Sequence, residues 1–239
     1  MSETLWIIIG VVIAVIVFSV LLSIASFSSD RFMQIYEKAS TTPAKTDLNI
    51  LDFVHNLNHI KLNGQISIAQ SDQDTNNFYV SKSKTVALSR KTLSSNTIAS
   101  FAIVAHEMGH AFQDQQGGKL KALNFFRRIG SLISYLFIPA LIAGVVLLII
   151  GGKLRIYSYI TLGVAGGIFL LAVLIKAITI AIERDASNKG LDFLEEILSP
   201  SEVAQCQKLL DAARLTYWGD LFRLLLSWTF LTKKTKMIR

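Results

Sequence analysis

The residues best suited to chemistry form the run His106-Glu107-Met108-Gly109-His110. Two histidines at positions i and i+4 share one face of a helix, so both imidazoles can bind a single metal ion. Glu107 follows the first histidine and is placed to take a proton from an activated water and later to return it. The pattern predicts zinc-dependent hydrolysis, with His106 and His110 as ligands of Zn²⁺ and Glu107 as the general base.

A catalytic zinc needs a third protein ligand and an open position for water. The longer motif H-E-x-x-H-x-x-G-x-x-H is not completed, because Gln113 and Gln116 occupy its last two required positions. An acidic residue from a second helix is the remaining option. Glu183 is the first candidate and Asp185 the second, although charges that merely flank a membrane helix are common.

The composition indicates which elements must position these residues. The chain has 239 residues, of which 51% are hydrophobic and 17% are charged. These values exclude a disordered chain, a collagen-like repeat and a coiled coil, and they disfavour an ordinary cytosolic enzyme. The single cysteine, Cys206, excludes a disulfide scaffold and a cysteine-based metal site within one chain. The net charge of +7 is not accompanied by a nucleic-acid-binding motif, so no nucleic acid partner is expected.

Three uncharged or nearly uncharged segments are long enough to cross a bilayer: 5–27, 132–150 and 156–182. Lys176, near the end of the third segment, could reach the lipid–water interface. The first segment could be a cleaved signal peptide, but residues 1–4 lack Lys and Arg and the apolar run is too long for a signal core. A polytopic protein with about three transmembrane helices, embedded in the lipid bilayer, is predicted.

The charge distribution predicts the orientation. Residues 28–131 contain 12 Lys and Arg and residues 183–239 contain 9, whereas residues 1–4 contain none. Three spans place both polar regions on one side, and the positive-inside rule makes that side cytoplasmic, with the N-terminus outside. We therefore expect a multi-pass protein of the cell membrane in which the H-E-x-x-H segment and Glu183 meet in the cytoplasm.

Local patterns predict the remaining elements. Residues 48–59 are expected to form a helix, residues 65–69 a strand, and residues 78–80 and 85–88 a short β-hairpin. Asn96 is expected to cap a helix that reaches about residue 114 and is too short to span a membrane. The fold class is therefore mainly α, with a small α+β, zincin-like catalytic region. After the third apolar segment, Gly190 and the Ser199-Pro200 step are expected to punctuate further helices. The amphipathic stretch 218–231 is expected to lie on or enter the membrane surface.

The two polar motifs resemble those of the YugP-type bacterial membrane zinc metallopeptidases. That family combines an H-E-x-G-H-A-x-Q helix with a downstream E-x-D-A-S element, and this chain matches both, from His106 to Gln113 and from Glu183 to Ser187. The chain is similar also to the wider membrane gluzincins, which use H-E-x-x-H with a distant Glu. The resemblance implies Glu183 as the third zinc ligand. The acidic residue that such relatives carry one turn beyond this Glu is Ser187 here, with Asp185 nearby, so the residue that supports Glu183 is left open.

Several residues are candidates for supporting roles. Asp114 lies one turn after His110 and could accept the second ring N–H of that ligand. Arg184, Tyr79 and Tyr217 could each stabilise a developing oxyanion, and the sequence does not choose among them. His55 and His59 also stand at i and i+4, but no Glu follows His55, so a solvated helix face is favoured.

The leading hypothesis is a membrane-embedded, zinc-dependent metalloendopeptidase that cleaves peptides or membrane proteins. The segment 78–88 could supply an edge strand for an extended substrate. An intramembrane site-2-type protease is a second hypothesis, although only the reversed order Gly190-Leu191-Asp192 is present in place of its L-D-G motif. A third is a non-enzymatic, zinc-binding membrane scaffold or regulator. The need for a membrane-protein partner and the oligomeric state are left open.

Overall fold

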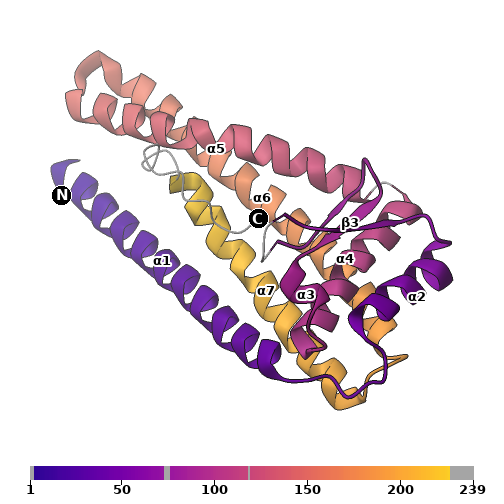
Figure 1. Ribbon diagram of the computed structural model, residues 1–239. Coiled ribbons are helices and arrows are strands. Elements are labelled where there is room, and N and C mark those ends of the chain that lie inside the picture. Colours follow the sequence, from indigo (N-terminus) through magenta and orange to yellow (C-terminus); the bar gives the residue numbers. More distant parts are fainter. Residues whose placement is uncertain (1–2, 73–75, 118, 227–239) are drawn as a thin grey trace.

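The computed structural model describes residues 3–72, 76–117 and 119–226, and it is mainly helical, as predicted (Figure 1). The helices are α1 (Glu3–Thr41), α2 (Ile50–Leu62), α3 (Arg90–Leu93), α4 (Ile98–Gln116), α5 (Lys119–Ile150), the 3-10 turn η1 (Gly152–Leu154), α6 (Arg155–Leu194) and α7 (Pro200–Leu226). The strands are β1 (Ser67–Gln70), β2 (Phe78–Val80) and β3 (Thr85–Leu88).

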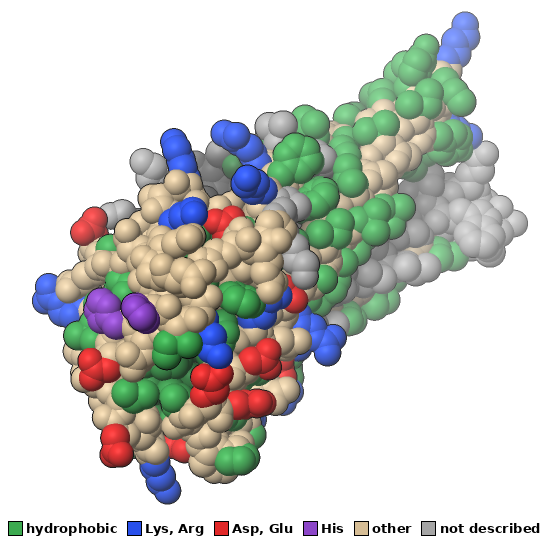
Figure 2. All heavy atoms as spheres, turned by 90° about the vertical axis from the view of Figure 1, so that its right-hand side faces the viewer, with side chains coloured by type: hydrophobic (Ala, Val, Ile, Leu, Met, Phe, Trp, Pro, Cys, Tyr) green, Lys and Arg blue, Asp and Glu red, His purple; other side chains and the backbone are tan. Residues whose placement is uncertain are grey.

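The long helices α5 and α6 form an antiparallel hairpin that extends from the rest of the molecule (Figure 1). Among the described residues, 124–150 and 152–194 are helical, long and apolar enough to cross a membrane. Their apolar side chains are largely uncovered, since Ile149 is 74% exposed and Leu170 is 63% exposed, which is unlike a core helix of a soluble protein. Figure 2 shows hydrophobic side chains along this extension and charged ones at the opposite end. The predicted span 5–27 lies within α1 and stays a prediction.

Helix α4 lies at the centre of the globular end, where it packs against α2, the sheet, α6 and α7. Most of its apolar residues are buried, and the ring of Phe101 contacts that of Phe53 on α2 with centroids 5.3 Å apart. Thr97, and not the predicted Asn96, caps α4 by accepting from the Ser100 amide. Asn96 instead accepts a hydrogen bond from the amide of Ile50. This bond joins the start of α2 to the start of α4.

The three strands form one sheet in the order β1-β3-β2. The predicted hairpin is confirmed, since β2 and β3 are antiparallel with Tyr79 opposite Val86. Strand β1 begins two residues later than predicted and runs parallel to β3, with Ile68 opposite Val86. Strand β2 is therefore an edge of the sheet, and it lies next to α4.

One prediction about the C-terminal half needs correction, and another is left largely untested. Gly190 does not interrupt a helix, because α6 continues without a break to Leu194. The chain then turns, and α7 runs back beside α1 toward the same end as the apolar hairpin (Figure 1). The amphipathic stretch 218–231 begins inside α7, and its residues after Leu226 lie outside the described part of the chain.

Candidate metal centre

Helices α4 and α6 approach each other closely through two glycines. A β-carbon at Gly190 would come within 2.6 Å of the carbonyl oxygen of Ala105, and one at Gly109 would collide with the carbonyl of Ala186. Only residues without a side chain permit this separation of the two backbones. The crossing therefore places the H-E-x-x-H turn of α4 directly against the turn of α6 that carries Glu183.

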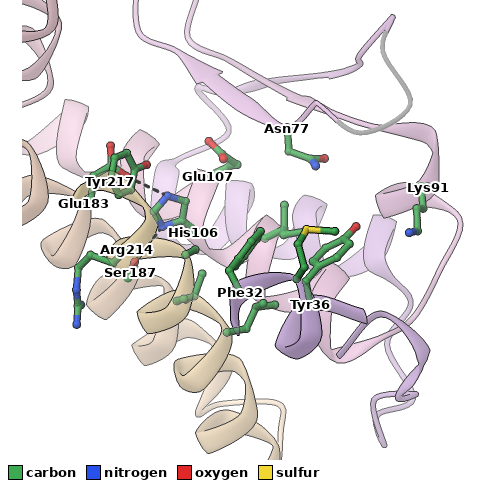
Figure 3. Close-up of a pocket in the computed structure, with 15 residues that line it drawn as sticks. Phe32, Tyr36, Asn77, Lys91, His106, Glu107, Glu183, Ser187, Arg214 and Tyr217 are labelled. Atoms are coloured by element: carbon green, nitrogen blue, oxygen red, sulfur yellow. Dashed lines mark hydrogen bonds and ion pairs between the residues drawn. The ribbon is translucent and has the colours of Figure 1, made fainter. Parts of the chain in front are cut away.

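His106, His110 and Glu183 meet at this crossing. The Oε2 atom of Glu183 lies 3.3 Å from Nε2 of His106 (Figure 3) and 3.3 Å from Nε2 of His110. The three ligand atoms all lie within 4.8 Å of one another. Glu183 is only 2% exposed. A buried carboxylate is costly without cationic or hydrogen-bonding partners. Two imidazole nitrogens and one carboxylate oxygen also form the ligand set of many catalytic zinc sites.

Gln113 determines which nitrogen of His110 faces this cluster. Its side-chain amide group donates to the Ile182 carbonyl at 2.9 Å and to Asp185 at 2.7 Å. Its carbonyl oxygen therefore faces Nδ1 of His110, 3.0 Å away, and can only accept. In neutral His110 the proton must lie on Nδ1, and Nε2 presents its lone pair to the centre. This is the tautomer that a metal ligand requires.

His106 has an equivalent partner on α6. Its Nδ1 lies 3.1 Å from the hydroxyl oxygen of Ser187, which is 5% exposed and able to accept a hydrogen bond. Ser187 thus allows the same tautomer at His106 that Gln113 imposes at His110. The donor set fits a zinc ion, because both histidines can direct Nε2 lone pairs toward the carboxylate of Glu183.

Asp185 lies beside the cluster without joining it. Its Oδ2 atom accepts from Gln113 and forms an ion pair with Lys189 at 2.6 Å. Asp185 therefore orients the amide that in turn orients His110. Sequence reasoning named Gln113 and Ser187 as motif positions but did not predict that they are the partners of His110 and His106.

Asp114 has partners other than His110. Its carboxylate accepts hydrogen bonds from the Tyr79 hydroxyl at 2.9 Å and the Ser81 hydroxyl at 2.7 Å. Burial and the Asp114 carboxylate raise the pKa of Tyr79 well above its ordinary value. Asp114 therefore connects β2 to α4, and the position proposed for it beside His110 is taken by Gln113.

Two cavities open on the metal centre, with volumes of about 310 Å³ and about 200 Å³. Both are lined by the same group of five residues: Asn77, His106, Glu107, Glu183 and Tyr217. The larger cavity continues between α1 and α7, and the smaller one continues along β2. The centre is thus open to space toward α1 and α7 and also toward β2.

Of the remaining residues predicted to act at the site, one lines the cavities at the metal centre and the others lie away from them. Tyr217 lines both cavities, and Nζ of Lys176 lies 5.0 Å from its ring centroid. Lys176 is therefore directed at an aromatic ring on α7, and its expected position at the lipid–water interface stays a prediction. Arg184 is exposed and lines neither cavity, and His55 and His59 are exposed on α2, as a solvated face requires.

Comparisons with known proteins agree with this chemistry. A family model described as "Putative neutral zinc metallopeptidase" matches residues 6–231. "Putative membrane protease YugP" of Bacillus subtilis (strain 168) is 24% identical over 192 residues, which cover 79% of this chain and 78% of that protein. No solved structure is a significant match.

Proposed function

The chain belongs to the neutral zinc metallopeptidase family, and we propose that it is a membrane-embedded, zinc-dependent metalloendopeptidase. The family membership agrees with the resemblance to YugP-type membrane metallopeptidases. The observation that carries the proposal is the cluster of His106, His110 and Glu183, in which His110 and Glu183 are buried. Its histidines come from α4 and its carboxylate from the far end of α6, after the apolar hairpin in sequence.

His106 and His110 would hold the ion through Nε2, and Glu183 through its carboxylate. In this position a zinc ion would supply a Lewis acid that lowers the pKa of water and polarises a carbonyl group. Ser187 and Gln113 fix the two imidazole rings from behind. Because these partners already engage both Nδ1 atoms, the rings need no reorganisation when the ion binds.

Glu107 would act as the general base and then as the proton donor to the leaving amine. It follows His106 directly on α4, is only 9% exposed, and lines both cavities. A largely buried carboxylate beside the cluster can take a proton from water that enters from either cavity. The same carboxylate can return that proton to the nitrogen of the broken peptide bond.

Tyr217 is the best placed of the three residues considered for stabilising the oxyanion. It lines both cavities, whereas Arg184 lines neither and the Tyr79 hydroxyl is engaged with Asp114. The ammonium group of Lys176 over its ring favours a tyrosine with a polarised hydroxyl. A peptide substrate would extend along the edge strand β2, through which backbone hydrogen bonds can add affinity.

The membrane arrangement is also proposed. The two helical segments 124–150 and 152–194, together with the segment 5–27, would anchor the chain in the cell membrane. The positive-inside rule would place the metal centre in the cytoplasm. Substrates would then be membrane proteins or peptides presented at the membrane surface, and a membrane-protein partner could deliver them.

The two alternatives are less well supported. An intramembrane site-2-type protease would need its H-E-x-x-H in a spanning helix, but α4 has 19 residues and packs inside the globular end against α2 and the sheet. A non-enzymatic scaffold would not need a base, yet Glu107 is present and lines both cavities at the cluster.

The direct experiment is cleavage of unfolded casein in detergent by the zinc-loaded chain and by Glu107→Gln. The parent is expected to generate new amino termini, and the variant is expected to bind zinc equally but to lose activity. If zinc-loaded parent and variant cleave at the same rate, the assigned mechanism is wrong. If neither cleaves although zinc is bound, the scaffold alternative gains support.

A further inference from the structure

The larger cavity beside the metal centre has apolar walls. Its lining includes Phe32, Met33 and Tyr36 from α1, Ile103 from α4, and Leu209 and Leu210 from α7. Its volume of about 310 Å³ lies at the low end of the roughly 300–1,000 Å³ typical of small-molecule pockets. This space suits one or two side chains and is too small for a folded partner.

The polar end of this cavity is the metal centre itself. His106, Glu107, Glu183 and Ser187 all line it, and Figure 3 shows Phe32 and Tyr36 projecting from α1 on the other side of His106 from Glu183. A residue whose side chain occupied the apolar part would therefore hold its own backbone near the catalytic groups. The cavity is placed to receive the residue next to the bond that is cleaved.

The charged side chains at the cavity do not favour an acidic ligand. Nζ of Lys91 lies 5.2 Å from the ring centroid of Tyr36, and the guanidinium group of Arg214 is paired with Asp211 at 2.8 Å. Both cations are therefore already engaged, while Glu107 and Glu183 line the polar end. An uncharged, apolar side chain is the occupant that fits these surroundings.

We propose that this cavity is a specificity pocket that binds a large apolar side chain, such as Phe, Leu or Met, next to the scissile bond. This inference rests on the proposed function and adds the class of substrate. Phe32, Met33 and Tyr36 belong to the same continuous helix as the predicted span 5–27 and follow it within about three turns. The pocket wall is thus an extension of the membrane anchor, so the preferred substrates are apolar segments that emerge near the membrane.

The test uses the zinc-loaded full chain in detergent with a peptide library whose cleavage products are identified by mass spectrometry. Large apolar residues are expected at one position next to the cleaved bond, with at least tenfold higher kcat/KM for Phe than for Ala there. Ala213 also lines the cavity, so Ala213→Phe should fill it and reduce this ratio at least tenfold. Ala204→Phe makes the same change at an exposed position of α7 and should keep the parental ratio.

Zinc content, measured for each variant, separates loss of selectivity from loss of the centre. Cleavage without an apolar preference, or a preference that Ala213→Phe leaves intact, would overturn the inference while the proposed function stands. A lipid that co-purifies with the parent but not with Ala213→Phe, without peptide selectivity, would assign the cavity to an acyl chain and also overturn it. If neither casein nor any peptide is cleaved, the proposed function fails and the inference fails with it.

Discussion

Gly190 on α6 lies so close to Ala105 on α4 that an added β-carbon would approach the Ala105 carbonyl oxygen to 2.6 Å. One residue after Ala105 comes His106, and two turns before Gly190 comes Glu183. The two halves of the candidate metal centre are therefore joined at a contact that tolerates no side chain. This packing explains why a glycine lies inside a long helix, where it ordinarily costs stability.

Substitution Gly190→Ala should weaken both the fold and the metal centre. In an isolated helix this change would stabilise by about 1 kcal/mol. Here the new methyl group meets backbone, so we expect a loss of roughly 1–3 kcal/mol and reduced zinc content. Thermal unfolding in detergent and metal analysis measure both effects. Gly167→Ala is the matched control, because nothing lies within 4 Å of its added β-carbon; equal behaviour of the two variants would contradict this account.

Substitution Gln113→Leu should weaken zinc binding without removing any ligand. The variant deletes the acceptor at Nδ1 of His110, so the ring loses its fixed orientation. Loss of such a partner typically costs 10–100-fold in metal affinity, which competition with a chelator would measure. Gln116→Leu, on the exposed end of the same helix, should retain the parental affinity. Unchanged affinity in Gln113→Leu would show that the tautomer argument is wrong.

Substitution Tyr217→Phe should lower kcat about 100-fold, the usual cost of losing one oxyanion donor. The phenylalanine ring keeps the contact with Lys176, so only the hydroxyl group is tested. KM and zinc content are expected to stay close to the parental values. Tyr79→Phe, whose hydroxyl bonds Asp114, should change kcat only a few-fold; a larger effect there than at Tyr217 would reverse the assignment.

The Tyr79–Asp114 pair should make the folded protein sensitive to alkaline pH. The pKa of Tyr79 is raised above its ordinary value of about 10 in the folded state. Above pH 10 the unfolded chain releases this proton and the folded chain retains it, so the pair's contribution to stability falls as pH rises. Melting temperatures between pH 8 and 11 should therefore fall less steeply for Tyr79→Phe than for Tyr135→Phe. Parallel curves would contradict the prediction.

The features that the sequence predicted correctly are local. The helix around His106, the hairpin with Tyr79 opposite Val86, and the apolar segments that became α5 and α6 all depend on periodicity or composition within short windows. The family was also recognised from two short motifs, and its model covers residues 6–231.

The features that could not be predicted from the sequence depend on contacts between distant segments. Gly190 was expected to end a helix, because a glycine has low helix propensity and its packing against Ala105 is not visible in the sequence. Gln113 could not be identified as the partner of His110 until Asp185 and the Ile182 carbonyl had fixed its amide.

The central claim is that α4 and α6 together hold one zinc ion, and its most direct test is the zinc content of purified Glu183→Gln. The account predicts about one zinc per chain in the parent and in Glu195→Gln, an exposed carboxylate on the turn after α6. It predicts little zinc in Glu183→Gln, with the helical content retained by circular dichroism. A full complement of zinc in a folded Glu183→Gln protein would contradict the account.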